Sequence, residues 1–142
     1  MPQVFDLAGS LAISDSVKYF YRLRNDSLWL MPFDSSKLDY FKSISFVEKY
    51  LAERYSDILD YVHWDDISCS LYILRRALQT EPEDSPTVSQ IYKRIKDSDI
   101  CGFIMSAPRS IKTKIIAAVT KLMPRKLAFK FLRLVGKLKG DS

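Results

Sequence analysis

The spacing of apolar residues from position 35 onward constrains the fold of this chain most, because it follows the period of an α-helix. The first stripe consists of Leu38, Phe41, Ile44, Val47 and Leu51. These residues recur three or four positions apart, and Ser35 or Ser36 is placed to cap the helix that they predict.

Two further helices follow the same logic. One is predicted from Asp65 or Asp66 to about Leu78, with the two aspartates serving as N-cap and as partners of the helix dipole. The other is predicted over "TVSQIYKRIKD", residues 87–97, after a polar loop with two prolines. Since a helix start accounts for Asp65 and Asp66, we do not expect them to bind a metal.

The N-terminal region contains a different pattern. Residues 4–13 predict a short helix, whereas residues 17–22, "VKYFYR", are rich in aromatic and β-branched side chains and predict one short strand. A lone strand cannot satisfy its own backbone hydrogen bonds, so its partner is either a strand not recognised here or a sheet outside this chain. The expected fold class is mainly α, a helical bundle-like region with this one aromatic strand.

The C-terminal segment is strongly basic. Residues 107–142 hold ten Lys and Arg against one acid, a net charge of +9, whereas residues 1–106 hold twelve against sixteen, a net charge of −4. "IKTKIIAAVTKLMPRKLAFKFLRLVGKLK" predicts two amphipathic helices interrupted at Pro124. We therefore divide the chain into a helical subdomain, residues 1–106, and a pair of basic amphipathic helices, residues 107–142.

The second of these helices suits an anionic membrane surface. At about 100° per residue, its basic side chains form a narrow ridge beside a broad apolar surface, as in helices that lie in a membrane interface. The residues expected to bind the membrane are Lys121, Arg125, Lys126, Phe129, Lys130, Phe131, Arg133 and Lys137. The alternative is an ordinary terminal helix packed on the domain, with its lysines in solvent. No nucleic-acid partner is expected, because the aromatic residues do not alternate with the basic ones as a stacking platform requires.

The remaining features exclude several classes of protein. The chain has neither a basic, apolar leader nor about 18 consecutive apolar residues, so we expect no secretory signal and no membrane span. Cys69 and Cys101 are far apart in sequence and predict reduced, buried thiols in a cytosolic protein. His63, the only histidine, is expected to pack or to begin a helix.

Three segments, in order, resemble the C-terminal part of bacterial family 2 glycosyltransferases that build cell-surface polysaccharides. They are "YFYRLRNDSLW" (residues 19–29), "FDSSKLDYFKSISFVEKYLAERY" (residues 33–55) and "KLMPRKLAFKFLRLVGKLK" (residues 121–139). The resemblance implies that Arg22, Arg24 and Ser27 bind the diphosphate of a nucleotide-sugar donor. From spacing alone, without the resemblance, the two arginines are better explained as the solvated side of a strand.

The resemblance also implies what this chain lacks. The family's nucleotide-sugar domain, with its acidic motif for Mg²⁺ or Mn²⁺ and its general base, has no counterpart here, so no cofactor is expected in this chain and a divalent metal only in an intact parent enzyme. The expected function is the C-terminal part of a glycosyltransferase, peripheral on the inner face of the plasma membrane, partnered by an upstream nucleotide-sugar domain and not active alone. The alternative is a non-enzymatic helical module that binds a membrane surface or a partner protein.

Overall fold

A computed structural model describes residues 32–138, which form one compact unit of six α-helices and two short 3₁₀ turns. The elements are η1 (Ser35–Leu38), α2 (Asp39–Arg54), η2 (Ser56–Ile58), α3 (Leu59–Thr80), α4 (Pro86–Asp97), α5 (Ile100–Ser106), α6 (Ile111–Leu122) and α7 (Arg125–Leu138). The prediction of a mainly α fold is confirmed. The predicted helix at residues 4–13 and the predicted strand at residues 17–22 lie outside the described residues.

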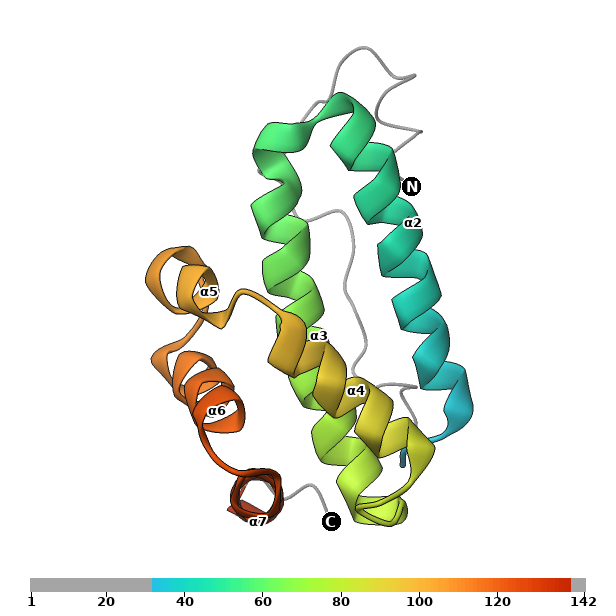
Figure 1. The fold of residues 1–142 in the computed structure, drawn as a ribbon, viewed down its shortest axis with the longest axis vertical. Coiled ribbons are helices and arrows are strands. Elements are labelled where there is room, and N and C mark those ends of the chain that lie inside the picture. Colours follow the sequence, from blue (N-terminus) through green and yellow to red (C-terminus); the bar gives the residue numbers. More distant parts are fainter. Residues whose placement is uncertain (1–31, 139–142) are drawn as a thin grey trace, which may run out of the picture. The chain divides into compact units, whose positions relative to one another are not determined.

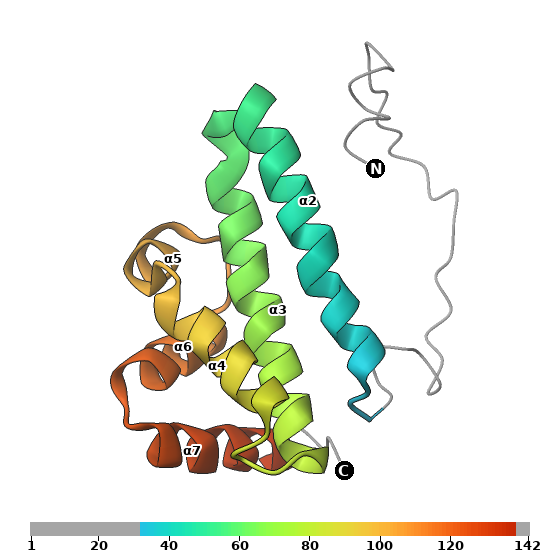
Figure 2. The same cartoon turned by 45° about the vertical axis from the view of Figure 1, so that its right-hand side comes forward.

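Helix α3 is the centre of the unit. It forms a long hairpin with α2 and contacts α4, α5, α6 and α7 along its other sides (Figures 1 and 2). Its residues Ile73, Leu74 and Ala77 are fully buried, and they meet apolar side chains from every helix after it. A 22-residue helix surrounded by shorter ones gives the domain a single continuous core.

Local capping sets where most of the later helices begin. The side chains of Ser85, Asp99 and Ser110 each accept a hydrogen bond from a backbone N–H in the first turn of α4, α5 and α6 respectively. Pro86 occupies the first turn of α4, where a missing N–H costs nothing. The predicted third helix and the two helices on either side of Pro124 are confirmed.

The predicted start of the second helix is wrong. Helix α3 begins at Leu59, six residues before Asp65, so Asp65 and Asp66 lie within the helix and cap nothing. Their carboxylates instead bind arginines on other elements, which satisfies them without a helix end. Helix α5 was not predicted, because seven residues are too few to display a helical period.

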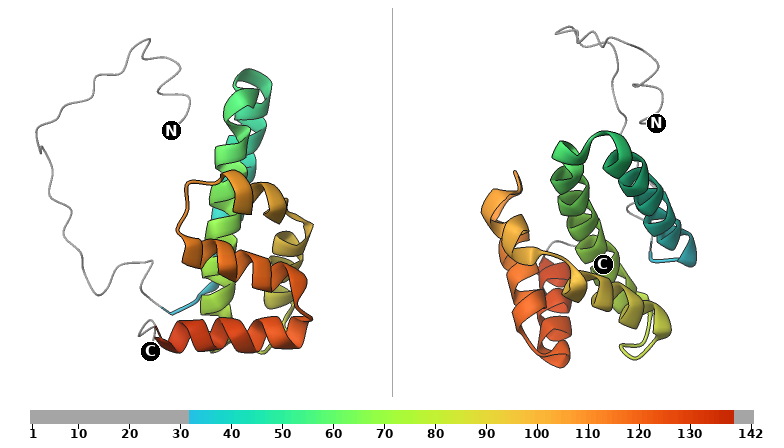
Figure 3. Two further views of the ribbon diagram at one scale, coloured as in Figure 1. Left: turned by 90° about the vertical axis from the view of Figure 1, so that its left-hand side faces the viewer. Right: turned by 45° about the horizontal axis from the view of Figure 1, so that its top comes forward.

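Helices α6 and α7 run side by side across the same side of α3 (Figure 3). At Gly136 the backbone of α7 approaches α3 so closely that an added Cβ would lie 3.2 Å from the Gln79 side chain. The predicted boundary at residue 106 falls between α5 and α6, where Ala107 is buried in the common core. The two C-terminal helices are thus part of the same compact unit as α3.

The prediction that both cysteines are buried is wrong for one of them. Both thiols are free, but only Cys69 is half-buried, on α3, whereas Cys101 is exposed on the short helix α5. Burial raises the pKa of the Cys69 thiol, which keeps it protonated and unreactive at neutral pH.

Candidate functional site

The predicted donor-phosphate residues Arg22, Arg24 and Ser27 lie outside the described residues. The predicted membrane-binding residues, in contrast, all belong to α6 and α7. Of these residues, the side chain of Lys137 lies outside the described part of the structure. The structure divides them into an inward-facing group and an outward-facing group.

Lys121 belongs to the inward-facing group. Its ammonium group donates to the carbonyls of Lys96 and Ser98, at the C-terminal end of α4, while Lys96 donates to the carbonyls of Lys121 and Met123 at the end of α6. Each lysine therefore caps the helix that carries the other. The C-terminal end of a helix has unpaired carbonyls and a partial negative charge, which is why the ammonium groups of two lysines can lie close together here.

Arg125 and Arg133 are exposed but also bind back onto the fold, and they share one partner, Glu83, in the loop before α4. The Arg125 guanidinium donates to the Glu83 carbonyl and to Ser89 Oγ at 2.9 Å. Arg133 Nη1 lies 2.8 Å from Glu83 Oε1, and its Nε donates to the carbonyl of Leu78 at 3.2 Å. These contacts hold α7 against the α3–α4 connection.

The two phenylalanines of the predicted set differ in burial. Phe129 is fully buried and meets the ring of Tyr92 edge-on, with the ring centroids 5.1 Å apart. Phe131 is half-buried. The apolar side of α7 that contains Phe129, Ala128 and Leu132 is therefore occupied by the protein core and does not face a lipid surface.

The outward-facing group is Lys126 and Lys130, which lie next to Arg133 around α7, on the flank between the buried face and the side opposite it. Lys126 and Lys130 are exposed and form no ion pair with any described residue, and the apolar side chains of Leu127 and Leu134 are exposed beside them. At about 100° per residue, the two leucines lie within about 20° of each other on the helix, roughly opposite the buried face. This outer face pairs unneutralised cations with exposed apolar surface.

A second exposed apolar face, on α6, was missed by the sequence analysis. Ile111, Ile115 and Leu122 point away from the core, and Lys112 and Lys114 lie on either side of them. One sequence signal was available: "IKTKIIAAVTKL" contains more apolar residues than a single core-facing stripe requires. We call the outer sides of α6 and α7 together the outer C-terminal surface.

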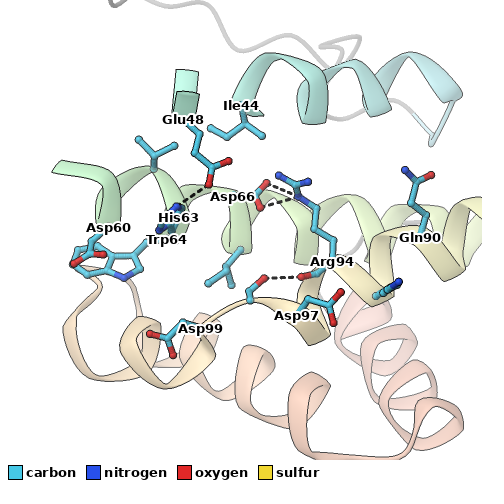
Figure 4. A pocket seen from close by; sticks show the side chains of 14 residues that line it. Ile44, Glu48, Asp60, His63, Trp64, Asp66, Gln90, Arg94, Asp97 and Asp99 are labelled. Carbon is cyan, nitrogen blue, oxygen red and sulfur yellow. Dashed lines mark hydrogen bonds and ion pairs between the residues drawn. The ribbon is translucent and has the colours of Figure 1, made fainter. Parts of the chain in front are cut away.

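An open groove of about 620 Å³ lies between α2, α3 and α4 (Figure 4). Two polar pairs join its walls. His63 Nε2 lies 2.8 Å from Glu48 Oε1, and Arg94 Nε binds both carboxylate oxygens of Asp66, at 2.8 and 3.1 Å. His63 therefore links α3 to α2 within the hairpin, which extends its expected packing role.

The charged groups in the groove hold α3 and α4 together. Burial raises the pKa of Asp66, and the hydrogen bond and charge of Arg94 oppose that rise. Arg94 also lies over the ring of Phe41, with its guanidinium carbon 5.0 Å from the centroid. Ser98 has the single hydroxyl group among the described lining residues, and this hydroxyl donates to the Arg94 carbonyl at 2.7 Å.

Two features are absent from residues 32–138. Nowhere in this range do three His, Cys, Asp or Glu side chains gather as a possible metal site. Likewise, none of the helices from α2 to α7 combines the length and the apolar character that crossing a bilayer requires. The divalent metal expected for an intact parent enzyme stays a prediction.

The outer C-terminal surface is therefore the arrangement in the described residues that most clearly offers unneutralised charge and exposed apolar side chains to a partner. Comparison of the chain with protein-family models, with curated proteins and with solved structures found no match to any of them.

Proposed function

We propose that this chain is a helical module that docks on an anionic membrane surface through the outer C-terminal surface. The observation that supports this is the division of the cations. Lys121, Arg125 and Arg133 on α6 and α7, and Arg109 just before α6, bind partners within the fold, whereas four lysines on these two helices form no ion pair with any described residue. Those four are Lys112, Lys114, Lys126 and Lys130.

Electrostatics favour a lipid surface of negative charge. Residues 107–138 contain no acid, so nothing on the outer surface opposes attraction to anionic headgroups. A lysine near such a surface contributes about 1 kcal/mol, so four would contribute about 4 kcal/mol at moderate ionic strength. Because anionic lipids concentrate in the cytoplasmic leaflet, the inner face of the plasma membrane is the proposed location.

The test is co-sedimentation with lipid vesicles. We expect the chain to bind vesicles that contain phosphatidylglycerol and to bind phosphatidylcholine vesicles much more weakly, with affinity that decreases as salt rises. Replacing Lys126 and Lys130 by Gln removes about 2 kcal/mol, or about 30-fold in affinity. The matched control replaces the exposed lysines Lys49 and Lys93 on α2 and α4, which lowers the net charge equally.

The comparison of the two double variants decides whether membrane binding depends on the outer C-terminal surface or only on the net positive charge of the chain. An equal loss in both double variants would mean that net charge alone drives binding, and it would overturn the proposed docking surface. Absence of binding by the unmodified chain would overturn the membrane function. Point variants are required because removing residues 107–142 would uncover core residues on α3 and α4.

We also propose that this module belongs to a larger enzyme. The order of the three segments that resemble family 2 glycosyltransferases favours a C-terminal region of such an enzyme. The enzyme would transfer a sugar from a nucleotide-sugar to a surface glycan carried on lipid at the same membrane. Arg22, Arg24 and Ser27 would then bind the donor diphosphate, since guanidinium groups bind phosphate bidentately. The test is to translate the DNA upstream of the codon for Met1 and to identify co-purifying chains. If neither the upstream DNA nor a co-purifying chain contains a nucleotide-sugar domain, this proposal is refuted. The proposed membrane function would then still stand.

A further inference from the structure

Helix α6 has apolar side chains on two opposite sides. Ala117 and Thr120 are fully buried against the core, whereas the side chains of Ile111, Ile115 and Leu122 are 76%, 52% and 82% exposed. At about 100° per residue, the three exposed side chains fall within about 40° of one another, roughly opposite the buried pair. The helix thus presents a coherent apolar stripe to its surroundings.

The exposed apolar side chains of this domain are concentrated near that stripe. Ten large apolar side chains are exposed in the described residues, and six of them lie between Met105 and Leu134. Single exposed apolar residues are ordinary on protein surfaces, but a stripe on one helix face marks an interaction surface. Helix α7, whose own exposed leucines were described above, lies beside α6 on the same side of α3 (Figure 3).

The charges around the stripe identify the partner. Lys112 and Lys114 lie about 100° and about 60° from Ile111 on opposite sides of the stripe, where their apolar stems can extend along a surface while their ammonium groups reach outward. The centres of protein interfaces are depleted in lysine, whereas lysines that flank an apolar stripe are typical of helices that lie in a lipid interface. With 12 residues, α6 extends about 18 Å and lies along such a surface.

We propose that α6 is the inserting element: it lies in the plane of an anionic membrane and places Ile111, Ile115 and Leu122 at the boundary between headgroups and acyl chains. This inference rests on the proposed membrane function. It assigns the apolar contacts with the membrane to α6, whereas the basic ridge that attracts anionic headgroups belongs to α7. Binding then has two separable contributions, a salt-sensitive one from the lysines and a salt-resistant one from α6.

The first experiment removes the stripe at its two most exposed positions. The variant Ile111→Gln, Leu122→Gln changes the ends of α6, where neither side chain belongs to the core. We expect its affinity for phosphatidylglycerol-containing vesicles to fall by about 30-fold or more, with unchanged helix content. The control, Phe46→Gln with Tyr61→Gln, removes side chains that are 55% and 59% exposed on α2 and α3, and it should bind like the unmodified chain.

The second experiment measures insertion directly. An environment-sensitive fluorophore is attached at Leu122→Cys in a chain that also has Cys69→Ala and Cys101→Ser. Its emission should shift to the blue on binding and be quenched by brominated acyl chains. The same label at Phe46→Cys should do neither.

The outcomes separate this inference from the proposed function. If the unmodified chain binds anionic vesicles, and the α6 variant binds equally well or the label at position 122 stays in water, α6 does not insert and the membrane function stands. An equal loss in the α6 variant and its control would also overturn the assignment to α6. If the unmodified chain binds no vesicle, both proposals are overturned.

Discussion

Replacing Phe129 by Ala tests whether α7 belongs to the core, as the structure has it, or is a detachable lipid-binding helix. The Phe129 ring is fully buried, contacts Tyr92 edge-on, and lies beneath the Arg125 guanidinium, whose carbon is 5.1 Å from the ring centroid. Truncating a buried Phe to Ala costs about 3–5 kcal/mol, because the lost burial is compounded by a cavity. Total stability for a domain of this size is about 5–15 kcal/mol, so the variant would be close to its stability limit.

The measurement is urea unfolding followed by circular dichroism, with thermal unfolding in parallel. At about 4 °C for each kcal/mol, the melting temperature should fall by about 12–20 °C. Phe131→Ala on the same helix is the matched control, since Phe131 is half-buried and its loss should cost only about 1 kcal/mol. The two variants remove the same ring from positions two residues apart.

A Phe129→Ala protein that keeps its unfolding midpoint but loses lipid binding would refute the packing of α7. It would mean that α7 leaves the core to meet the membrane. Equal destabilisation by the two variants would refute the distinction between the inner and outer sides of this helix.

Three further predictions concern contacts within the fold. Replacing Lys121 by Gln should lower the free energy of unfolding by about 1.5–3 kcal/mol, because it leaves helix-end carbonyls without a charged donor, whereas Lys126→Gln should change it by less than about 0.5 kcal/mol in urea titrations. Burial raises the pKa of Asp66 above its ordinary value of 3.8, so the contribution of Asp66 to stability should decrease as the pH rises from 3.8 through the pKa of the folded state. The variant Asp66→Asn should remove this decrease in stability. The variant Arg94→Met should raise the pKa of Asp66 further in an NMR titration. Gly136→Ala should change the melting temperature little, since a gain of up to about 1 kcal/mol in helix propensity is opposed by the new methyl lying 3.2 Å from Gln79 Nε2, whereas the larger side chain of Gly136→Leu should lower it.

The helical stripes were predictable because each depends on residues close together in sequence. The stripe from Leu38 to Leu51 and the break at Pro124 predict helices that the structure contains, since helical period and proline chemistry are local. The predicted cap at Ser35 or Ser36 is wrong, because these residues lie in a 3₁₀ turn that the side chain of Asp34 caps. The start of α3 was not predictable in this way. Asp65 and Asp66 look like a cap in sequence, and only contacts with Arg109 and Arg94, 44 and 28 residues away, reveal that they bind across the fold.

The candidate surface was only partly predictable for a similar reason. The sequence reveals that α7 has a basic ridge and a broad apolar surface, but which apolar residues face the core depends on Tyr92 and on the close approach at Gly136. The outer stripe of α6 was hidden for the opposite reason. A helix that is apolar on two sides resembles a fully buried helix until its neighbours are known.

The ion pairs of Arg109 and Arg133 have a consequence for experiments with peptide fragments. Their carboxylate partners, Asp65 and Glu83, belong to α3 and to the loop before α4, so part of the contrast between an acidic body and a basic tail is neutralised inside the folded domain. A synthetic peptide spanning residues 107–138 would regain these charges and would expose Phe129 and Leu132 as well. Its affinity for vesicles would therefore overstate that of the intact chain, and peptide mimics of this region would be misleading models of it.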